Sequence, residues 1–355
     1  MTMKRNLLPR RLAIPGIVLA ATGALLGSSA LPSLPGLPGL PGLADREPAP
    51  RGLNVLLMGT DERNTLTAAQ KKKFHAGGRP CGCSDVLMLV HVSARGDRVS
   101  VIGMPRDSYA EIPPYRAKPG GKERPPHPAK LNAAYQEGGP ELMIRTVESM
   151  TEVDIDRFLQ VDFRRFMNSV DKVGGVEVCT PRRLKDAATR LDLKPGKHRL
   201  GGGQALQYVR SRHVDGSADL GRIQRQQRFL VQAWRELKER KLLTHPKRMT
   251  DLMEMLLGSG RQGFSPGELV ELAATLHRLP DSATEFTTVP IAGFAPAKLG
   301  IGAALAWDRK ETDALFAKVR DDRPLVERGA QPKPKDPPDI LGKTVPVRGS
   351  AYACH

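Results

Sequence analysis

Residues 84–107 read S-D-V-L-M-L-V-H-V-S-A-R-G-D-R-V-S-V-I-G-M-P-R-D, and this stretch decides the fold. Two apolar runs, 85–93 and 98–105, flank the tight-turn sequence A-R-G-D, which predicts a β-hairpin. If the turn centres on its Arg-Gly pair, Asp85 faces Arg106 across the hairpin, at one end of a sheet.

Strand and helix patterns alternate on both sides of this hairpin. N-V-L-L-M-G from Asn54 is a short strand candidate, and 163–173 carries apolar residues at helical spacing. Interleaved strands and helices predict an α/β or α+β domain with a central sheet. Further strands are expected at 157–162, 176–179 and 284–289, helices at 131–137, 140–150, 203–210, 221–241, 246–257 and 265–277, and a Lys/Gly/Pro-rich loop at 113–129.

The N-terminal region carries an export pattern. Residues 1–11 hold basic side chains and no acidic one, and residues 12–32 are apolar or small. A helix needs roughly 20 such residues to cross a bilayer, and its basic flank stays cytoplasmic. The pattern predicts a transmembrane signal-anchor and a single-pass type II protein of the cell membrane. A cleaved signal peptide is the alternative, because Ser28-Ser29-Ala30 resembles a cleavage site.

Composition divides the rest of the chain into three parts. Residues 33–52 repeat Leu-Pro-Gly and predict a stiff linker, 53–322 predict one large extracytoplasmic domain, and the Pro- and Lys-rich 323–355 predict a loose tail. The net charge of +17 calls for an anionic partner. Because either N-terminal reading exports the chain, no nucleic acid partner is expected.

Export permits disulfides, and the chain has four cysteines. Cys81 and Cys83 are too close in sequence to pair comfortably with each other. The pairing with Cys179 and Cys354 stays open at this point.

Two acidic residues at expected strand ends lie near arginines. Asp61 follows the first strand, with Arg63 two residues later, and Asp85 opens the hairpin that Arg106 closes. Carboxylates at neighbouring strand ends suit Mg²⁺, which prefers hard oxygen ligands. A simple cross-strand salt bridge between Asp85 and Arg106 is an equally ordinary explanation.

A second basic cluster follows in V-R-S-R-H and G-R-I-Q-R-Q-Q, residues 209–213 and 221–227. Arg222 and Gln226 are one helical turn apart and fall within the apolar arc of their helix. A charge on a buried arc is costly unless it is paired, so Arg222 is expected to bind an anion, and a structural salt bridge is the alternative. The opposite face, with Arg225 and Arg228, is expected to be solvated. Asp219 is placed to cap this helix or to hold an arginine.

Guanidinium groups match phosphate oxygens bidentately. Arginines from several segments, two carboxylates and a glutamine therefore predict a site that binds and polarises a pyrophosphate. No protein nucleophile is required, because an acceptor hydroxyl can attack.

At these residues the chain resembles the LytR-CpsA-Psr family of cell-wall glycopolymer ligases. The resemblance runs in order from 54 to about 235. It is carried by residues 54–63, 84–90, 101–109, 130–142, 161–166, 171–178, 193–213 and 219–227, which include G-T-D-E-R, M-P-R-D-S-Y and V-R-S-R-H.

The resemblance implies a three-layer α/β/α fold with a central mixed sheet and a hydrophobic pocket for a polyprenyl tail. It implies Mg²⁺, replaceable by Mn²⁺, at Asp61 and Asp85. It also implies that Asp107 or Asp219 positions or deprotonates the acceptor hydroxyl. The implied pyrophosphate ligands are Arg63, Arg106, Lys130, Arg210, Arg212, Arg222 and Gln226, and the implied catalytic residues among or beside them are Arg106, Asp107, Arg210, Arg212, Arg222 and Gln226.

The implied activity is a phosphotransfer. A polyprenyl (undecaprenyl) pyrophosphate carrier would give up its glycopolymer phosphate to a peptidoglycan hydroxyl, outside the cytoplasmic membrane. Two alternatives share the same residues: a hydrolase that cleaves the lipid pyrophosphate with water, and a non-catalytic binder of polyprenyl phosphates. The helices expected at 140–150 and 163–173 are candidates for lining the tail pocket, although ordinary core packing predicts the same pattern.

Overall fold

The computed structural model describes residues 52–77, 82–240, 245–257, 263–342 and 344–354. The expected cytoplasmic segment 1–11, the signal-anchor 12–32, Cys81 and all but the last residue of the linker 33–52 lie outside the described residues. Within the part of the chain that the structure describes, no helix combines the length and the hydropathy that a membrane crossing requires.

A six-stranded mixed sheet forms the centre of the described domain, in the order β16-β13-β3-β2-β1-β8. The β1–β2, β2–β3 and β13–β16 pairs are antiparallel, whereas β1–β8 and β3–β13 are parallel. This confirms the central mixed sheet. The strands are β1 (Leu53–Thr60), β2 (Ser84–Val92), β3 (Val99–Gly103), β8 (Arg157–Asp162), β13 (Thr284–Thr288) and β16 (Val347–Arg348).

The hairpin register agrees with the prediction from its turn. Met88 pairs with Gly103 and Val92 with Val99. This register, continued past the end of β3, brings Arg106 to Asp85, and the two side chains form an ion pair.

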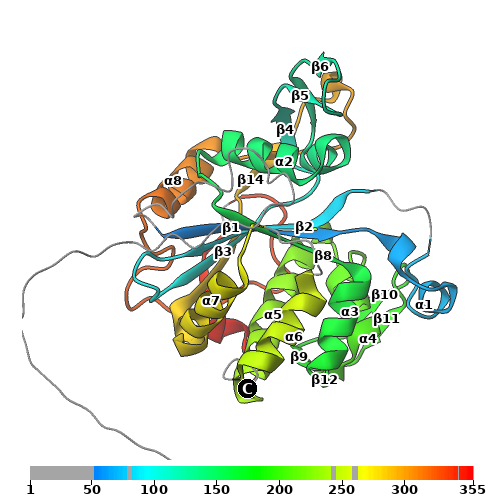
Figure 1. Ribbon diagram of the computed structural model, residues 1–355, viewed down its shortest axis with the longest axis vertical. Helices are drawn as coiled ribbons and strands as arrows, with labels where there is room; N and C mark the ends of the chain where they lie inside the picture. Colours follow the sequence, from blue (N-terminus) through cyan, green and yellow to red (C-terminus); the bar gives the residue numbers. More distant parts are fainter. Residues whose placement is uncertain (1–51, 78–81, 241–244, 258–262, 343, 355) are drawn as a thin grey trace, which may run out of the picture. The chain divides into compact units, whose positions relative to one another are not determined.

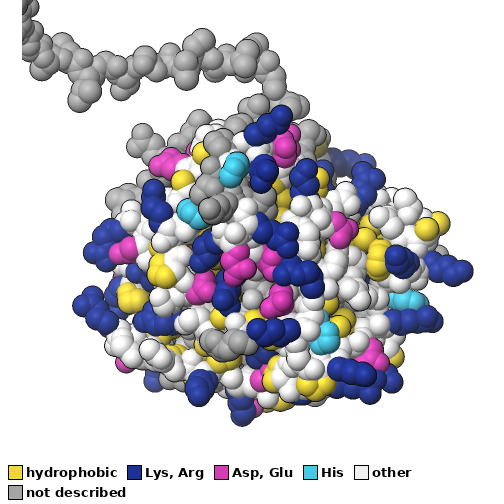
Figure 2. Space-filling view, turned by 90° about the horizontal axis from the view of Figure 1, so that it is seen from below, with side chains coloured by type: hydrophobic (Ala, Val, Ile, Leu, Met, Phe, Trp, Pro, Cys, Tyr) yellow, Lys and Arg dark blue, Asp and Glu magenta, His cyan; other side chains and the backbone are white. Residues whose placement is uncertain are grey.

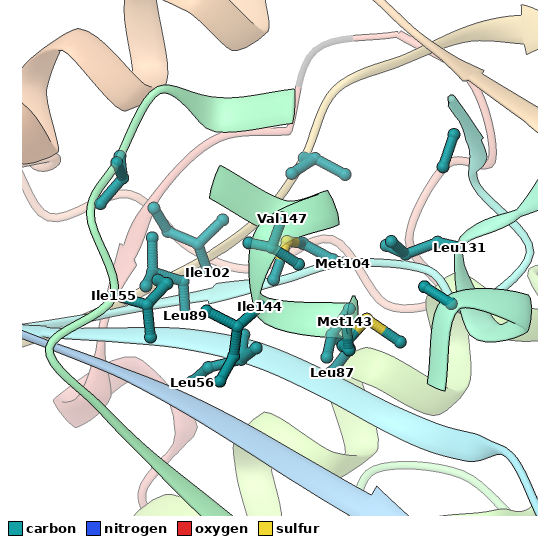
Figure 3. Close-up of a cluster of buried hydrophobic side chains, with 14 of the residues drawn as sticks. Leu56, Leu87, Leu89, Ile102, Met104, Leu131, Met143, Ile144, Val147 and Ile155 are labelled. Carbon is teal, nitrogen blue, oxygen red and sulfur yellow. The ribbon is translucent and has the colours of Figure 1, made fainter. Parts of the chain in front are cut away.

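Helices cover both faces of the sheet and complete the three layers (Figure 1). On one face, α2 (Leu131–Thr151) and α8 (Arg309–Arg320) pack on Leu56, Leu89 and Ile102, as Figure 3 shows for α2. On the other face, α5 and α7 pack on Met88 and Val101. The helices of this second layer are α3 (Phe163–Lys172), α4 (Gly202–Arg210), α5 (Ala218–Glu239), α6 (Pro246–Leu257) and α7 (Pro266–Arg278).

The two helices expected at 131–137 and 140–150 are the two halves of α2. Gly138 and Gly139 between them have non-helical backbone angles, and Gly139 has a φ of 67°. Glycine adopts this positive φ without steric cost, and Pro140 is tolerated because it begins the second half.

The expected loop at 113–129 is wrong in part, because this segment builds two small ribbons. β4 (Tyr109–Ile112) pairs with β7 (His127–Lys130), and β5 (Tyr115–Arg116) pairs with β6 (Glu123–Arg124). The buried side chains of Tyr115 and Ala129 anchor them on the domain.

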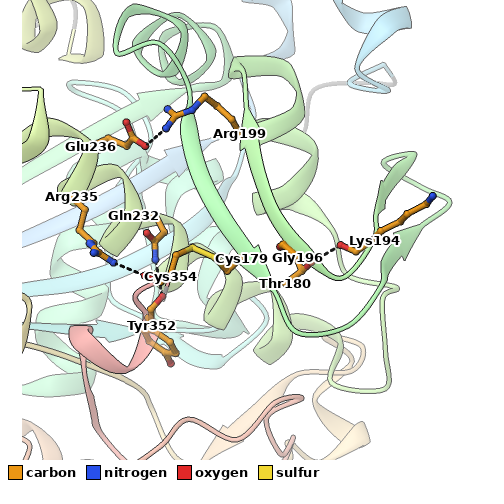
Figure 4. Close-up of a disulfide and its surroundings, with 10 residues drawn as sticks. All are labelled: Cys179, Thr180, Lys194, Gly196, Arg199, Gln232, Arg235, Glu236, Tyr352 and Cys354. Atoms are coloured by element: carbon orange, nitrogen blue, oxygen red, sulfur yellow. Dashed lines mark hydrogen bonds and ion pairs between the residues drawn. A yellow bond between two sulfur atoms is a disulfide. The ribbon is translucent and has the colours of Figure 1, made fainter.

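The prediction of a loose tail over 323–355 is also wrong. β16 extends the central sheet beside β13, and Cys354 forms a disulfide with Cys179 at the end of β9 (Figure 4). Tyr352 accepts a hydrogen bond at its carbonyl oxygen from Gln232 Nε2, at 2.8 Å. The tail therefore covers the face of α5 that was expected to be solvated.

The expectation that Arg225 and Arg228 are solvated is wrong as well. Arg225 is 5% exposed and donates to the carbonyl oxygen of Ser211 at 2.6 Å, while Arg228 pairs with Asp336 of the tail at 2.8 Å.

The remaining elements are η1 (Arg63–Thr65), α1 (Ala68–Lys73), β9 (Val176–Thr180), β10 (Leu184–Asp186), β11 (Leu191–Leu193), β12 (Gly196–Leu200), η3 (Asp281–Ala283), β14 (Ile291–Phe294), η4 (Ala297–Leu299), β15 (Leu305–Trp307) and η5 (Gly349–Tyr352).

Replacing Cys354 by Ser is expected to lower the free energy of unfolding by about 2–5 kcal/mol, because the bridge closes a very long loop of chain. Guanidinium unfolding under non-reducing conditions measures this change. Ser350→Ala, an exposed position in the same tail, is the control and should keep the midpoint of the wild-type protein. An equal midpoint in Cys354→Ser would show that the bridge adds no stability.

Candidate active site

The site begins where β1 ends and β2 starts. The backbone N–H of Asp61 donates to the carbonyl oxygen of Cys83 at 3.1 Å, which places Asp61 beside the start of β2. Arg63, in the turn of η1, donates from Nε to Asp61 Oδ1 at 2.6 Å. The Asp61 side chain is almost fully buried, whereas Arg63 reaches the cavity described below.

Arg106 lies among three carboxylates. It pairs with Asp85, and its Nε is 3.6 Å from Asp107 Oδ2. Burial opposes its charge, but Asp85, Asp107 and Asp219 together outweigh burial and raise the pKa of Arg106. The guanidinium is therefore held firmly in its charged form.

A chain of ion pairs joins Arg106 to the second basic cluster. Asp107 contacts Lys130 Nζ at 3.2 Å and Arg212 at 3.6 Å. Asp219 then holds both Arg212, at 2.5 Å, and Arg222, at 3.2 Å. Of the two roles predicted for Asp219, pairing with an arginine is confirmed. The N-cap role is wrong, because Ser217 is the N-cap residue and Asp219 lies inside the first turn of α5.

Arg222 and Gln226 lie on the buried arc of α5, as predicted. Burial lowers the pKa of Arg222 to about 10, although Asp219 partly compensates. Gln226 donates from Nε2 to the carbonyl oxygen of Val209 at 3.0 Å, which ties α5 to the end of α4. The Nε atoms of Arg222 and Arg106 are buried without a hydrogen-bond acceptor among the described residues. Such donors favour an anionic ligand.

Arg210 has no carboxylate partner within the described residues. Its guanidinium lies over the ring of Phe163, 4.8 Å from the centroid, and donates to the carbonyl oxygen of His75 at 3.4 Å. Burial, and then the nearby charge of Arg63, lower the pKa of Arg210. An anion placed between Arg63 and Arg210 would relieve this repulsion.

The predicted cations outnumber the carboxylates that pair with them. Six predicted cations face the four predicted carboxylates and Asp186, which also lines the cavity, so these described side chains carry one surplus positive charge. The cations are Arg63, Arg106, Lys130, Arg210, Arg212 and Arg222, and the carboxylates are Asp61, Asp85, Asp107 and Asp219. On the face drawn in Figure 2, basic side chains likewise surround a smaller group of acidic ones.

A cavity of about 520 Å³ opens at this cluster and runs between α3, α5 and α6 under the sheet. Its polar end is lined by Arg63, Asp85, Arg106, Arg210, Arg212, Arg222 and Gln226, which brings together seven of the predicted residues. Its remaining walls are mainly apolar and include Phe166, Val170, Phe229, Trp234 and Leu256. The cavity is therefore amphipathic, with charge at one end and hydrocarbon along its length.

Of the two helices expected to line a tail pocket, α3 does so and the segment 140–150 does not. Met143, Ile144 and Val147 of that segment pack on the opposite face of the sheet, in the main core. Asp107 and Lys130 touch the cluster through ion pairs but do not line the cavity.

Sequence reasoning missed Asp186, which lines the cavity at the end of β10. Its carboxylate accepts hydrogen bonds from the backbone N–H groups of Ala188, Thr189, Arg212 and His213, at 2.6 to 3.2 Å. Burial alone would raise the pKa of Asp186, but these four bonds lower it. Asp186 thus positions the Arg212 segment. In the sequence, a short strand that ends in Asp cannot be distinguished from an ordinary turn.

Asp61 and Asp85 carry oxygen donors of the kind that Mg²⁺ prefers; Asp85 lines the cavity, whereas the Asp61 carboxylate is buried against Arg63. Two carboxylates stand at adjacent strand ends, and Mg²⁺ commonly takes one or two protein carboxylates while phosphate and water complete its shell. No cluster of three or more His, Cys, Asp or Glu side chains suited to a metal occurs in the described residues.

Comparison with known proteins identifies the family. The model of the family described as LytR_cpsA_psr matches residues 45–318, about three quarters of the chain. The chain belongs to the LytR-CpsA-Psr family. Among relatives, it is 32% identical over 270 residues to "Probable cell wall biosynthesis protein LcpB" of Corynebacterium glutamicum, covering 76% of this chain and 61% of LcpB. It is 27% identical over 249 residues to "Polyisoprenyl-teichoic acid--peptidoglycan teichoic acid transferase TagU" of Oceanobacillus iheyensis, covering 70% and 69%.

Solved structures of this family share the fold. Bacillus subtilis TagV superposes with a TM-score of 0.58 at 20% identity, covering 77% of this chain and 98% of TagV. The family protein YwtF (TagT) with bound octaprenyl pyrophosphate lipid gives a TM-score of 0.52 at 20% identity, covering 78% and 93%. The three-layer α/β/α prediction is confirmed. The chain spans 61% of LcpB and 64% of LcpA of Corynebacterium glutamicum, less than two thirds of each.

Proposed function

We propose that this LytR-CpsA-Psr protein is a phosphotransferase that moves a glycopolymer phosphate from a polyprenyl pyrophosphate carrier to a hydroxyl of peptidoglycan. The observation that carries the proposal is the amphipathic cavity. Its apolar walls offer a place for a prenyl chain, and its basic end offers a place for two phosphates. The relative named as a teichoic acid transferase and the relative with bound octaprenyl pyrophosphate support the same assignment.

The transfer needs positioning and charge neutralisation more than a protein nucleophile. The acceptor oxygen attacks the glycopolymer-linked phosphorus, a new P–O bond forms, and the bond to the carrier phosphate breaks. The carrier leaves as polyprenyl phosphate. Arg106, Arg210 and Arg222 balance the charge on the phosphates, with Arg63, Arg212, Lys130 and Gln226 completing the cluster.

The proton of the acceptor hydroxyl needs a base beside the phosphates. We assign this role to Asp107, because its carboxylate stands at the edge of the cluster and outside the cavity. Lys130 and Arg212 hold that carboxylate in place. Asp219 is less accessible, because its side chain is 8% exposed, against 20% for Asp107. When bound at Asp61 and Asp85, Mg²⁺ or Mn²⁺ would supply further positive charge to the pyrophosphate.

We also propose that residues 12–32 anchor the protein in the cytoplasmic membrane, with the described domain outside. The membrane-embedded carrier and the wall acceptor would then both reach the site. Labelling of an engineered cysteine before Lys4 and of one in the tail, in intact and in broken cells, tests this topology.

The full chain in detergent, given a polyprenyl pyrophosphate-linked oligosaccharide with a labelled sugar and fragments of peptidoglycan, should move the label onto the fragments. Chelation of divalent cations should lower the rate by more than about tenfold, and added Mg²⁺ or Mn²⁺ should restore it. Release of the label to water, with or without fragments, would identify a hydrolase. Tight binding of the carrier without turnover would identify a binding protein.

A further inference from the structure

A second cavity lies on the other side of the central sheet, between the β5–β6 ribbon and α2. It has a volume of about 250 Å³, and its lining includes Tyr115, Arg116, Glu123, Glu141 and Arg145. None of these residues belongs to the pyrophosphate cluster.

The walls of this cavity are held rigidly. Tyr115 donates its hydroxyl to Glu137 of α2 and accepts a hydrogen bond from Arg124 Nη1 at 2.9 Å. His127 of β7 contacts the same Glu137 carboxylate at 3.2 Å. On the opposite wall, Arg145 Nη1 donates to the carbonyl oxygen of Pro114 at 3.0 Å. The ribbon is thus fixed on α2 at both sides of the cavity, which preorganises it for a ligand.

The charges in the cavity are mixed in sign. Glu141 and Arg145 are one helical turn apart, share a face of α2 and are both exposed. Neither forms an ion pair with any residue that the structure describes, and they do not pair with each other. Arg116 and Glu123 across the ribbon are 3.7 Å apart. Unpaired charges of both signs suit a zwitterionic ligand and disfavour a polyanion, for which the glutamates would be repulsive.

The β4–β7 ribbon connects this cavity to the pyrophosphate cluster. Tyr109 pairs with Lys130 at the cluster end, and Ile112 pairs with His127 at the cavity end. Three residues of strand span about 10 Å. An extended peptide of four or five residues spans roughly 13–17 Å, so one ligand can reach from the cluster to the cavity.

We propose that this cavity binds the short, zwitterionic stem peptide that peptidoglycan carries, and so positions the sugar hydroxyl at the cluster. The inference rests on the proposed function, because it assigns the acceptor of that transfer. Arg145 takes a carboxylate of the peptide, and Glu141 takes the free amine of its diamino acid. Both residues act on acceptor binding and have no part in the chemical step.

The test is binding of a synthetic tetrapeptide, L-Ala–γ-D-Glu–L-Lys–D-Ala, to the full chain in detergent by calorimetry. Arg145→Gln and Glu141→Gln should each weaken binding about tenfold, since each removes one charged contact. A peptide with its amines acetylated and its carboxyls amidated should not bind. Lys310→Gln, an exposed change on α8, should bind the peptide as the wild-type protein does.

Transfer kinetics give the second readout. Both variants should raise the KM for peptidoglycan fragments about tenfold and leave the Kd for polyprenyl pyrophosphate unchanged. Glu141→Gln is the decisive variant, because Glu141 makes no contact whose loss would loosen the ribbon. Equal peptide binding and KM in Glu141→Gln and wild-type protein would overturn the inference. Absence of carrier binding in the wild-type protein would overturn the proposed function instead.

Discussion

Arg106→Gln is expected to lower kcat/KM for transfer by about 10²–10³-fold, by analogy with the loss that follows removal of one oxyanion-stabilising donor from an acyl-transfer site. Arg106 stands at the polar end of the cavity, and three carboxylates keep it charged. Glutamine can still hydrogen-bond Asp85 but brings no charge to the pyrophosphate. It also leaves Asp85 negative and without its cation, so the cluster becomes less attractive to an anion.

Two further variants show whether the charge or the geometry of Arg106 matters. Arg106→Lys keeps the charge but loses the planar fork, so it should recover only part of the rate. Arg309→Gln, an exposed change on α8, should transfer at the wild-type rate. Radiolabel transfer to peptidoglycan fragments measures all three, and circular dichroism reports folding. A fully active and folded Arg106→Gln would remove Arg106 from the mechanism and leave its pair with Asp85 as a structural salt bridge.

The hairpin shows what the sequence could predict. Its turn sequence and apolar runs set the pairing of β2 and β3, and that register alone placed Asp85 against Arg106. Local signals also placed α3 and β8 within a residue of their observed ends. These predictions succeeded because turn residues and side-chain spacing act over a few positions of the chain.

The outer face of α5 shows what the sequence could not predict. Arg225 and Gln232 look like surface residues on a helical projection, yet both are buried. Gln232 is covered by the C-terminal tail, whose Pro- and Lys-rich composition resembles a loose segment, whereas Arg225 is held by the carbonyl oxygen of Ser211, just after α4. Contacts between such distant segments, like the Cys179–Cys354 bridge, have no local pattern.

The candidate site falls between these two cases. Its residue types could be chosen, because arginines and carboxylates at strand and helix ends match a pyrophosphate. Their pairing could not, because Asp107 contacts three cations and Asp219 two, and these cations come from separate segments. The cavity was expected only because the family resemblance implied one, since apolar residues on α3 and α5 are equally compatible with a filled core.

Ala233→Phe is expected to weaken binding of a long-chain polyprenyl pyrophosphate by more than about 100-fold while raising the stability of the protein. Ala233 of α5 lines the apolar part of the cavity, between Phe229 and Leu237. A phenyl ring there occupies space that a prenyl chain would fill. Displacing about four carbons at ~0.8 kcal/mol each costs ~3 kcal/mol, which corresponds to roughly a 100-fold change in Kd. Filling an apolar void should also add about 0.5–2 kcal/mol to the free energy of unfolding.

The opposite signs of these two effects distinguish a binding tunnel from a packing defect. A substitution that damaged the core would lower both the lipid affinity and the stability. A phenyl ring that fills the tunnel lowers only the lipid affinity. Geranyl pyrophosphate, with its short chain, should bind Ala233→Phe and the wild-type protein equally, because the arginines at the polar end are untouched. Ala292→Phe, at an exposed position of β14, is the matched control and should leave both affinities unchanged. If Ala233→Phe bound the long and the short carrier as the wild-type protein does, the prenyl chain would have to lie outside this cavity. The arginine cluster would then be a surface phosphate site, without the hydrocarbon contacts that select a lipid carrier.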